Sequence, residues 1–184
     1  YNENNAEEIL KAALMPKEIT IRVNTLKISE EALIEELKKE DVRATKAAFE
    51  NALVIEARGA VYELQAYKKG FFHVEDISSQ ICVSELNLKE GYKFVDVCSA
   101  PGGKSFTAAQ YMNNTGVRYS CDIHPHRVEL IKDGAQRLSI TNIKPTVNDA
   151  LVFNEAFENA DCVLCDVPCS GMGIIGKKPE IKYK

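Results

Sequence analysis

Long apolar runs are absent from this sequence. No stretch approaches the ~18 consecutive apolar residues of a membrane helix, and no basic segment followed by an apolar one begins the chain. We therefore expect neither membrane insertion nor secretion. An excess of basic residues is also absent, because 23 Lys and Arg stand against 27 Asp and Glu, for a net charge of −4. This balance argues against a protein that covers nucleic acid with its whole surface, since phosphate binding needs a basic face.

The sequence does contain enough apolar material for one core of ordinary size and a smaller second one, with 45% hydrophobic residues. Its six cysteines lie mostly in predicted strands and helices among apolar neighbours, where a free thiol behaves as a small buried hydrophobe. Cys162 and Cys165 stand on one predicted strand with side chains on opposite faces, so they cannot hold the same ion. We expect no metal site, and reduced thiols fit a cytoplasmic protein.

A glycine turn between a strand and a helix is the most informative local feature. Residues 96–104 read Asp-Val-Cys-Ser-Ala-Pro-Gly-Gly-Lys; an apolar run precedes them, and an apolar-periodic helix around Phe106 and Ala109 follows. Such a turn exposes backbone N–H groups where a small charged ligand can dock, although an ordinary strand-to-helix turn has the same residues. Because the chain has no G-x-G-x-x-G sequence, the loop favours a nucleoside cofactor smaller than a dinucleotide.

Acidic residues stand at the ends of four successive predicted strands. They are Asp96, Asp122, Asp149 and Asp166. Asp122 follows the glycine turn at about the distance where a doubly wound fold places the carboxylate that binds ribose hydroxyls. Because the carboxyl ends of parallel strands meet at one edge of a sheet, we expect the four side chains to form a ligand site there. The pattern predicts an α/β fold with four parallel strands.

The amino-terminal third predicts a separate small α/β module. Its predicted elements are strands over 19–23, 42–47, 53–57 and 61–64 and a helix over 30–39 that Ser29 caps. A boundary near Gly70 divides the chain into domains 1–70 and 71–184, and the second domain is predicted to contain helices over 77–86 and 124–138. The first domain lacks the aromatic signature of an RNA-recognition motif, so we expect it to position the protein rather than to read a sequence.

Several motifs together resemble one known family. They are Arg22-Val-Asn-Thr-Leu26, Phe72–Gln80, Asp96–Lys104 and Asp166–Gly173 with the following Lys177–Ile181. These motifs resemble the S-adenosylmethionine-dependent RNA cytosine methyltransferases of the Sun/Fmu/RsmB group, which methylate carbon 5. The resemblance implies a Rossmann-like methyltransferase fold after a small RNA-recognition-like α/β domain. One departure is Ser99, where the family usually has alanine; a small side chain there still permits the tight turn.

The chemistry of this family explains a thiol at the fourth strand end. Carbon 5 of cytosine is a poor nucleophile, so a thiolate first adds to carbon 6 and makes carbon 5 able to attack a sulfonium methyl group. Enzymes that methylate exocyclic amines commonly have an aromatic ring after Asp/Asn-Pro-Pro. Here Asp166-Val-Pro-Cys169 has sulfur in the corresponding place. This substitution indicates chemistry at a ring carbon.

Two roles are open for Cys169. By analogy with DNA cytosine methyltransferases it is the nucleophile, whereas the RNA family uses a Thr-Cys thiol after the next strand as nucleophile and the Pro-Cys thiol to assist product release. The 184 residues contain no Thr-Cys pair. We favour the release role and expect the attacking thiol beyond Lys184. Only four of the usual seven sheet strands can be counted, so we expect the chain to be part of a larger protein, inactive alone.

The resemblance also implies which residues bind S-adenosyl-L-methionine. Its methionine portion would lie against the backbone of Cys98, Ser99, Ala100, Pro101, Gly102, Gly103 and Lys104. Asp122 would hold the ribose hydroxyls and Asp149 would lie against the adenine. Asp166 would stand near the methyl group and the target base, with Pro168 fixing the angle of Cys169. The side chain of Lys104 meets a carboxylate or faces solvent.

The implied partner is RNA, with small-subunit (16S) ribosomal RNA favoured over transfer RNA. Four lysines of the tail, Lys177, Lys178, Lys182 and Lys184, are either an RNA contact or a solvated end. Two other classes of protein remain open. One is a non-catalytic cofactor-binding or RNA-docking protein; the other is a nicotinamide-dependent oxidoreductase, which the missing dinucleotide motif disfavours. The sequence does not predict an oligomeric state.

Overall fold

The computed structural model describes residues 3–14 and 18–171. Within them, Ile19–Asp166 form one compact unit that contains two sheets. Helix α1 (Glu3–Leu14) and residues 167–171 lie outside that unit. The predicted tail lysines lie outside the described residues. In the part of the chain that the structure describes, no helix is both long enough and apolar enough to cross a membrane.

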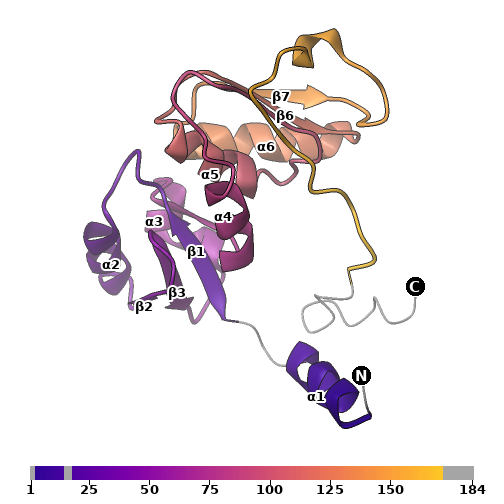
Figure 1. The fold of residues 1–184 in the computed structure, drawn as a ribbon. Helices are drawn as coiled ribbons and strands as arrows, with labels where there is room; N and C mark the ends of the chain where they lie inside the picture. Colours follow the sequence, from indigo (N-terminus) through magenta and orange to yellow (C-terminus); the bar gives the residue numbers. More distant parts are fainter. Residues whose placement is uncertain (1–2, 15–17, 172–184) are drawn as a thin grey trace. The chain divides into compact units, whose positions relative to one another are not determined.

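The first sheet is antiparallel and has the strand order β2-β3-β1-β4 (Figure 1). Its elements are β1 (Ile19–Val23), α2 (Glu30–Lys38), β2 (Arg43–Lys46), β3 (Ala52–Glu56), η1 (Val61–Glu63), α3 (Gln65–Lys68) and β4 (Phe72–Val74). Ser29 is the N-cap of α2, and its Oγ accepts a hydrogen bond from the Ala32 N–H, as its position before the helix predicts.

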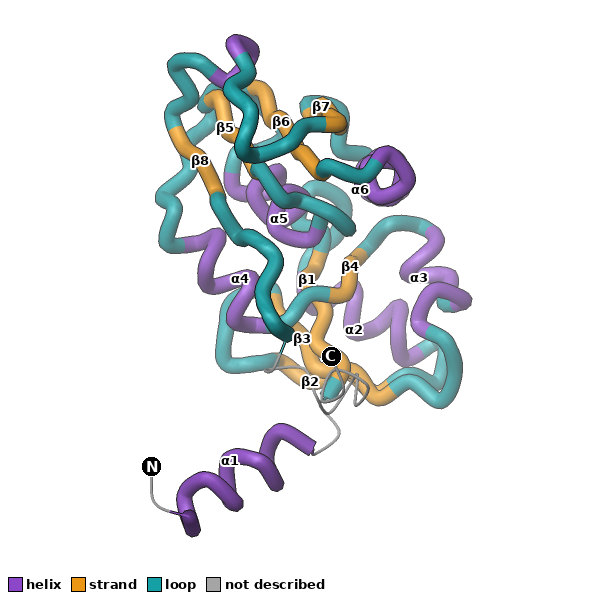
Figure 2. The backbone as a smooth tube through the Cα atoms, turned by 90° about the vertical axis from the view of Figure 1, so that its right-hand side faces the viewer, coloured by secondary structure: helices purple, strands orange, loops and turns teal. Residues whose placement is uncertain are grey.

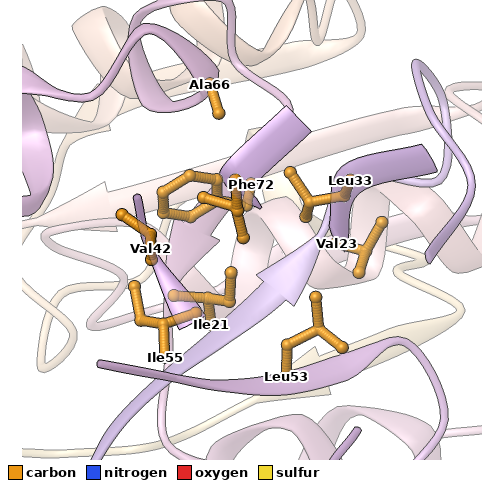
Figure 3. Packing of buried hydrophobic residues seen from close by; sticks show 9 residues of the cluster. Ile21, Val23, Leu33, Val42, Leu53, Ile55, Ala66 and Phe72 are labelled. Carbon is orange, nitrogen blue, oxygen red and sulfur yellow. The ribbon is translucent and has the colours of Figure 1, made fainter. Parts of the chain in front are cut away.

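The core of the first sheet lies on one face, under α2 and α3. Alternate residues of β1, Ile21 and Val23, are fully buried there and pack with Leu33 of α2 and Phe72 of β4 (Figure 3). The other face of β1 is buried as well, because Arg22 reaches α5 (Gly103–Tyr111) and donates from Nε to Gln110 Oε1 at 3.1 Å. Strand β1 is thus buried on both faces and lies between two packed layers.

Two elements of the first module differ from the sequence prediction. The predicted strand 61–64 is wrong: the chain forms the 3-10 turn η1 and then α3. The physical reason is a cap from outside the segment, because the Glu40 carboxylate accepts hydrogen bonds from the N–H groups of Gln65 (2.6 Å) and Ala66 (2.9 Å). Sequence reasoning also missed β4, which pairs with β1 and carries the first sheet past Gly70.

The second sheet is parallel, as predicted, with the strand order β7-β6-β5-β8. Its elements are α4 (Ile77–Ser84), β5 (Lys93–Asp96), α5, β6 (Val117–Asp122), α6 (Pro125–Leu138), β7 (Ile143–Val147), η2 (Glu155–Phe157) and β8 (Cys162–Leu164). Strands β6 and β7 are added one after the other on one side of β5, and the chain then crosses back so that β8 lies on the other side of β5. The carboxyl ends of β5 and β8 therefore form the switch point at which open α/β sheets hold ligands.

Helix α5 lies between the two sheets (Figures 1 and 2). Asn24 forms a second connection between the first module and α6. It is fully buried and donates from Nδ2 to Gly70 O (2.8 Å) and to Leu138 O at the end of α6 (2.9 Å). Arg137 of α6 donates from Nη1 to Tyr67 O (2.7 Å) and also to a β4 carbonyl. The motif that begins at Arg22 thus connects the first sheet to helices of the second half.

Candidate cofactor site

Backbone hydrogen bonds connect the loops at the carboxyl edge of the second sheet. Val97 N donates to Leu164 O of β8 (3.1 Å), and Ser99 N donates to Cys121 O of β6 (2.7 Å). The loop after β7 is joined in the same way, by Asn148 N to Asp122 O at 3.1 Å. The loops after these strands therefore lie along one edge, as the four acids predicted.

Glycine is required in the turn before α5. Gly102 is the N-cap of that helix and has φ of 113°, a conformation that other residues rarely adopt. A Cβ on Gly102 would also overlap with the ring of Phe106. The turn leads directly into the helix, whose first N–H groups have no partner within the helix and lie beside the switch point.

A network of hydroxyl groups holds Asp96 at the end of β5. Ser105 of α5 donates to Asp96 Oδ2 at 2.9 Å, and the hydroxyls of Ser99 (3.0 Å) and Ser120 (2.7 Å) contact Ser105. All four side chains are buried. Ser99, the departure from the family pattern, therefore adds a hydrogen bond that alanine could not make.

The buried environment of Asp96 disfavours the ionised form of its carboxyl group. Burial raises the pKa of its carboxyl group to about 6, and the Ser105 hydrogen bond offsets this only in part. Its second oxygen, Oδ1, is buried and accepts no hydrogen bond of good geometry among residues 3–14 and 18–171, although the Cys98 N–H and the Ser99 hydroxyl lie close enough to lower the pKa of the carboxyl group. A buried carboxylate oxygen without a donor is a group that a ligand can satisfy.

A cavity of about 180 Å³ opens at this point. Asp96, the loop from Cys98 to Pro101, Gly103, Lys104 and Asp166 line it, and all of them are residues that the sequence indicated. Lys104 Nζ lies 2.7 Å from Asp166 Oδ2. Burial lowers the pKa of Lys104, but the contact with Asp166 and the charges of Glu75 and Asp96 together outweigh burial, and the pKa lies above its ordinary value. Lys104 therefore meets a carboxylate, which belongs to the chain itself.

Three polar residues of the cavity wall were missed by sequence reasoning. Glu75, Asp76 and Ser79 line it from the segment between β4 and α4 and from α4 itself. They belong to the motif Phe72–Gln80, which carried part of the resemblance but had no assigned role. The polar residues of this motif were the available signal. The sequence alone could not show that β4 pairs with β1 and so brings this segment to the second sheet.

Asp122 and Asp149 do not line this cavity. Asp122 is 4% exposed; its Oδ2 lies 3.0 Å from Arg127 Nη1, and its Oδ1 accepts from His124 N at 3.0 Å. Arg127 also donates to Ala100 O at 3.1 Å, so the pair holds the start of α6 against the glycine loop. Asp149 stands two residues after β7, and its Oδ1 accepts from Leu151 N at 2.9 Å.

Pro168 and Cys169 lie outside the compact unit and are described separately. Both are exposed, and Cys169 Sγ accepts a hydrogen bond from Gly171 N at 3.4 Å. The residues of this motif that follow Gly171 lie outside the described residues. Within the segments 3–14 and 18–171, no group of three or more His, Cys, Asp or Glu side chains is placed to hold a metal ion.

The fold and the site define a class of protein. Four parallel strands with a switch point at the first strand, a glycine turn into a helix and a buried acid beside a small cavity define a Rossmann-like α/β protein with a candidate site for a small charged ligand. A small antiparallel α/β module precedes it.

Comparison with known proteins gives the family. The model of the family described as 16S rRNA methyltransferase RsmB/F matches residues 83–184, and the RsmF/B-like ferredoxin-like domain matches residues 1–62. The chain therefore belongs to the RsmB/F methyltransferase family.

Individual relatives agree with this assignment. The chain is 36% identical to the "Probable ribosomal RNA small subunit methyltransferase B" of Bacillus subtilis, over 100% of this chain and 41% of the relative. It is 33% identical to ribosomal RNA small subunit methyltransferase F of Vibrio campbellii, over 96% of this chain and 38% of the relative. A crystal structure of a methyltransferase homologue from Pyrococcus horikoshii superposes with a TM-score of 0.83 at 28% identity, over 97% of this chain and 60% of that one. The chain thus spans about two fifths of these two curated relatives.

Proposed function

We propose that this chain binds S-adenosyl-L-methionine and belongs to an enzyme that methylates carbon 5 of a cytosine in small-subunit ribosomal RNA. The observation that carries the proposal is the cavity at the switch point, where the glycine loop meets Asp96 and Asp166. Membership of the RsmB/F family supports the RNA substrate. The relatives from Bacillus subtilis and Vibrio campbellii, whose names state small-subunit ribosomal RNA, support this RNA over transfer RNA.

The residues at the cavity fit a cofactor with this distribution of charge. S-adenosyl-L-methionine has two cationic groups, a sulfonium and an ammonium, and one carboxylate. The cavity wall carries more acidic than basic side chains, and a buried oxygen of Asp96 lacks a donor in the described part of the chain. The first N–H groups of α5 suit the carboxylate. When bound, the cofactor supplies an electrophilic methyl group.

We assign the remaining roles residue by residue, following the family motif. The backbone of Cys98–Lys104 holds the methionine portion, Asp122 the ribose and Asp149 the adenine. Asp166, held by Lys104, faces the reacting end, and Pro168 orients Cys169. Cys169 assists release of the methylated base, and a different thiol attacks carbon 6.

A calorimetric titration tests the cofactor. We expect the chain to bind S-adenosyl-L-methionine and S-adenosylhomocysteine with one-to-one stoichiometry, and Asp96→Asn to weaken S-adenosyl-L-methionine because the amide removes the negative charge. Glu63→Gln neutralises an exposed carboxylate and is the matched control, so it should leave the affinity for S-adenosyl-L-methionine unchanged. Preferential binding of a nicotinamide dinucleotide would contradict the proposal and indicate an oxidoreductase.

The role of Cys169 is tested on the product of the complete reading frame, with methyl-tritiated cofactor and small-subunit ribosomal RNA. If Cys169 assists release, Cys169→Ala should stop turnover and leave a covalent protein–RNA adduct that survives a denaturing gel. If Cys169 were the nucleophile, the same variant would form no adduct. Methylation of transfer RNA in preference to ribosomal RNA would contradict the proposed substrate.

A further inference from the structure

The motif Phe72–Gln80 brings one acidic side chain of the first sheet to the cofactor cavity. Glu75 follows β4 directly, and its N–H still donates to Thr20 O of β1 at 3.1 Å. The residue is 6% exposed and lines the same cavity as Asp96. Its position is thus fixed by the first sheet, whereas the rest of the cavity wall comes mainly from the second.

One carboxylate oxygen of Glu75 is held firmly. Thr107 of α5 donates to Oε2 at 2.5 Å, and His73 Nε2 lies 3.3 Å from the same oxygen. The backbone is held as well, because Gln80 Nε2 donates to Glu75 O at 3.0 Å and Arg22 Nη1 contacts Gln80 Oε1 at 3.5 Å. Residues of both motifs that precede the glycine loop therefore contribute to holding Glu75 in place.

The other oxygen, Glu75 Oε1, is buried and has no hydrogen-bond partner in the segments that the structure describes. It faces the start of α5, since a Cβ built on Gly103 would stand 3.2 Å from it. Asp96 Oδ1, in the same cavity wall, lacks a partner in those segments too. Lys104, the cation of the wall, is paired with Asp166, and its charge also acts on Glu75 and Asp96 without donating to either free oxygen.

Two buried carboxylate oxygens without a donor beside one cavity favour a ligand that donates hydrogen bonds, and a cationic donor binds them more strongly than a neutral one. We propose that Glu75 binds the amino group of the amino-acid portion of S-adenosyl-L-methionine, together with Asp96. An ammonium group has three N–H donors and so can reach two carboxylates at once. This inference rests on the proposed function and adds that the first sheet supplies part of the cofactor site.

The test compares two ligands that differ in the amino group alone. S-adenosylhomocysteine carries it, and 5′-S-(3-carboxypropyl)-5′-thioadenosine has a hydrogen in its place. We expect wild-type protein to prefer S-adenosylhomocysteine at least tenfold in a calorimetric titration. Glu75→Gln should reduce this preference at least fivefold while it changes the affinity of the deaminated ligand less than twofold. Glu63→Gln is again the control and should keep the wild-type preference.

The ratio of the two affinities is measured on folded protein, so partial unfolding of Glu75→Gln would not imitate the expected result. An equal loss of affinity for both ligands would show that Glu75 acts only through the fold and would overturn the inference. An unchanged preference in Glu75→Gln, with wild-type binding intact, would overturn it while leaving the proposed function standing. If wild-type protein binds neither ligand, the proposed function fails and the inference fails with it.

Discussion

At the scale of single residues, the cavity wall contains one carboxyl group that destabilises the fold when it is ionised. Asp96 is 1% exposed, and burial raises the pKa of its carboxyl group to about 6. A hydroxyl network satisfies one of its oxygens and leaves the other without a donor in the described part of the chain. Buried carboxylates of this kind are common at ligand sites, and this agrees with the proposed role of Asp96 at the cavity.

Asp96→Asn should therefore stabilise the chain at neutral pH. The carboxyl group has an ordinary pKa of 3.8 and a folded-state pKa of about 6, so the folded state binds the proton more tightly. Asp96 is harmless below about pH 4, where it is protonated in both states, and it destabilises the fold increasingly as pH rises to 6. The difference between the two pKa values corresponds to about 3 kcal/mol above pH 6.

Urea unfolding at several pH values measures this effect. The amide that replaces the carboxylate is the neutral equivalent of the protonated acid and can still accept from Ser105, so Asp96→Asn should gain about 2–3 kcal/mol at pH 7.5 and almost nothing at pH 4. Asp133→Asn alters an exposed acid of α6 and is the comparison. A gain that does not depend on pH would mean that the ionised form of Asp96 is not the cause.

At the scale of elements, local sequence determines where most helices begin. Ser29 precedes α2 and Pro125 stands in the first turn of α6, as both were predicted to do. Asp76 is the N-cap residue of α4, although its side chain makes no capping hydrogen bond there. Element ends are thus set by short-range hydrogen bonds and backbone preference, which a sequence displays directly.

Ser29→Ala should destabilise the chain by about 1 kcal/mol, the usual effect of removing a capping side chain. The hydroxyl accepts the Ala32 N–H at 3.3 Å, and without it that N–H has only water as a partner. Urea unfolding at pH 7 measures the change. Ser84→Ala removes a hydroxyl that donates to Ile81 O and caps no N–H, so it should change stability by less than about 0.5 kcal/mol. Equal effects of the two substitutions would refute the capping role.

At the scale of the whole molecule, the two sheets depend on one another within the unit Ile19–Asp166. Arg22, Asn24 and Arg137 all form hydrogen bonds between the first module and helices of the second half. Their side chains are polar, but each has partners at defined positions, which fixes the register of one module against the other. The cavity contains residues from both, so this register matters for the site.

Asn24→Ala should cost about 2–4 kcal/mol, because the carbonyl groups of Gly70 and Leu138 lose their donor. We also expect the substitution to weaken binding of S-adenosyl-L-methionine, since Glu75 approaches the cavity from the first module. Unfolding and calorimetry on the same variant measure both effects. Gln136→Ala removes an exposed amide from α6 and should leave both unchanged. If Asn24→Ala unfolds at the same urea concentration as the wild type, the hydrogen bonds of Asn24 do not hold the two modules together.

The parallel strands, the glycine turn and the acids that follow the strands could all be predicted from the sequence, because a strand-to-helix turn is specified by neighbouring residues and by backbone preference. The same reasoning fails where partners are distant along the chain. β4 is a strand only because β1 offers it an edge, and 61–64 is a turn because Glu40 caps the next helix.

Which acids share the cavity depends on long-range packing. Asp96 and Asp166 meet there because β8 lies beside β5, whereas Asp122 is held by Arg127 and does not line the cavity. Glu75 reaches the cavity through strand pairing and interlocked side chains that are far apart in sequence. Such pairing and burial are collective properties of the folded chain, and no local pattern encodes them.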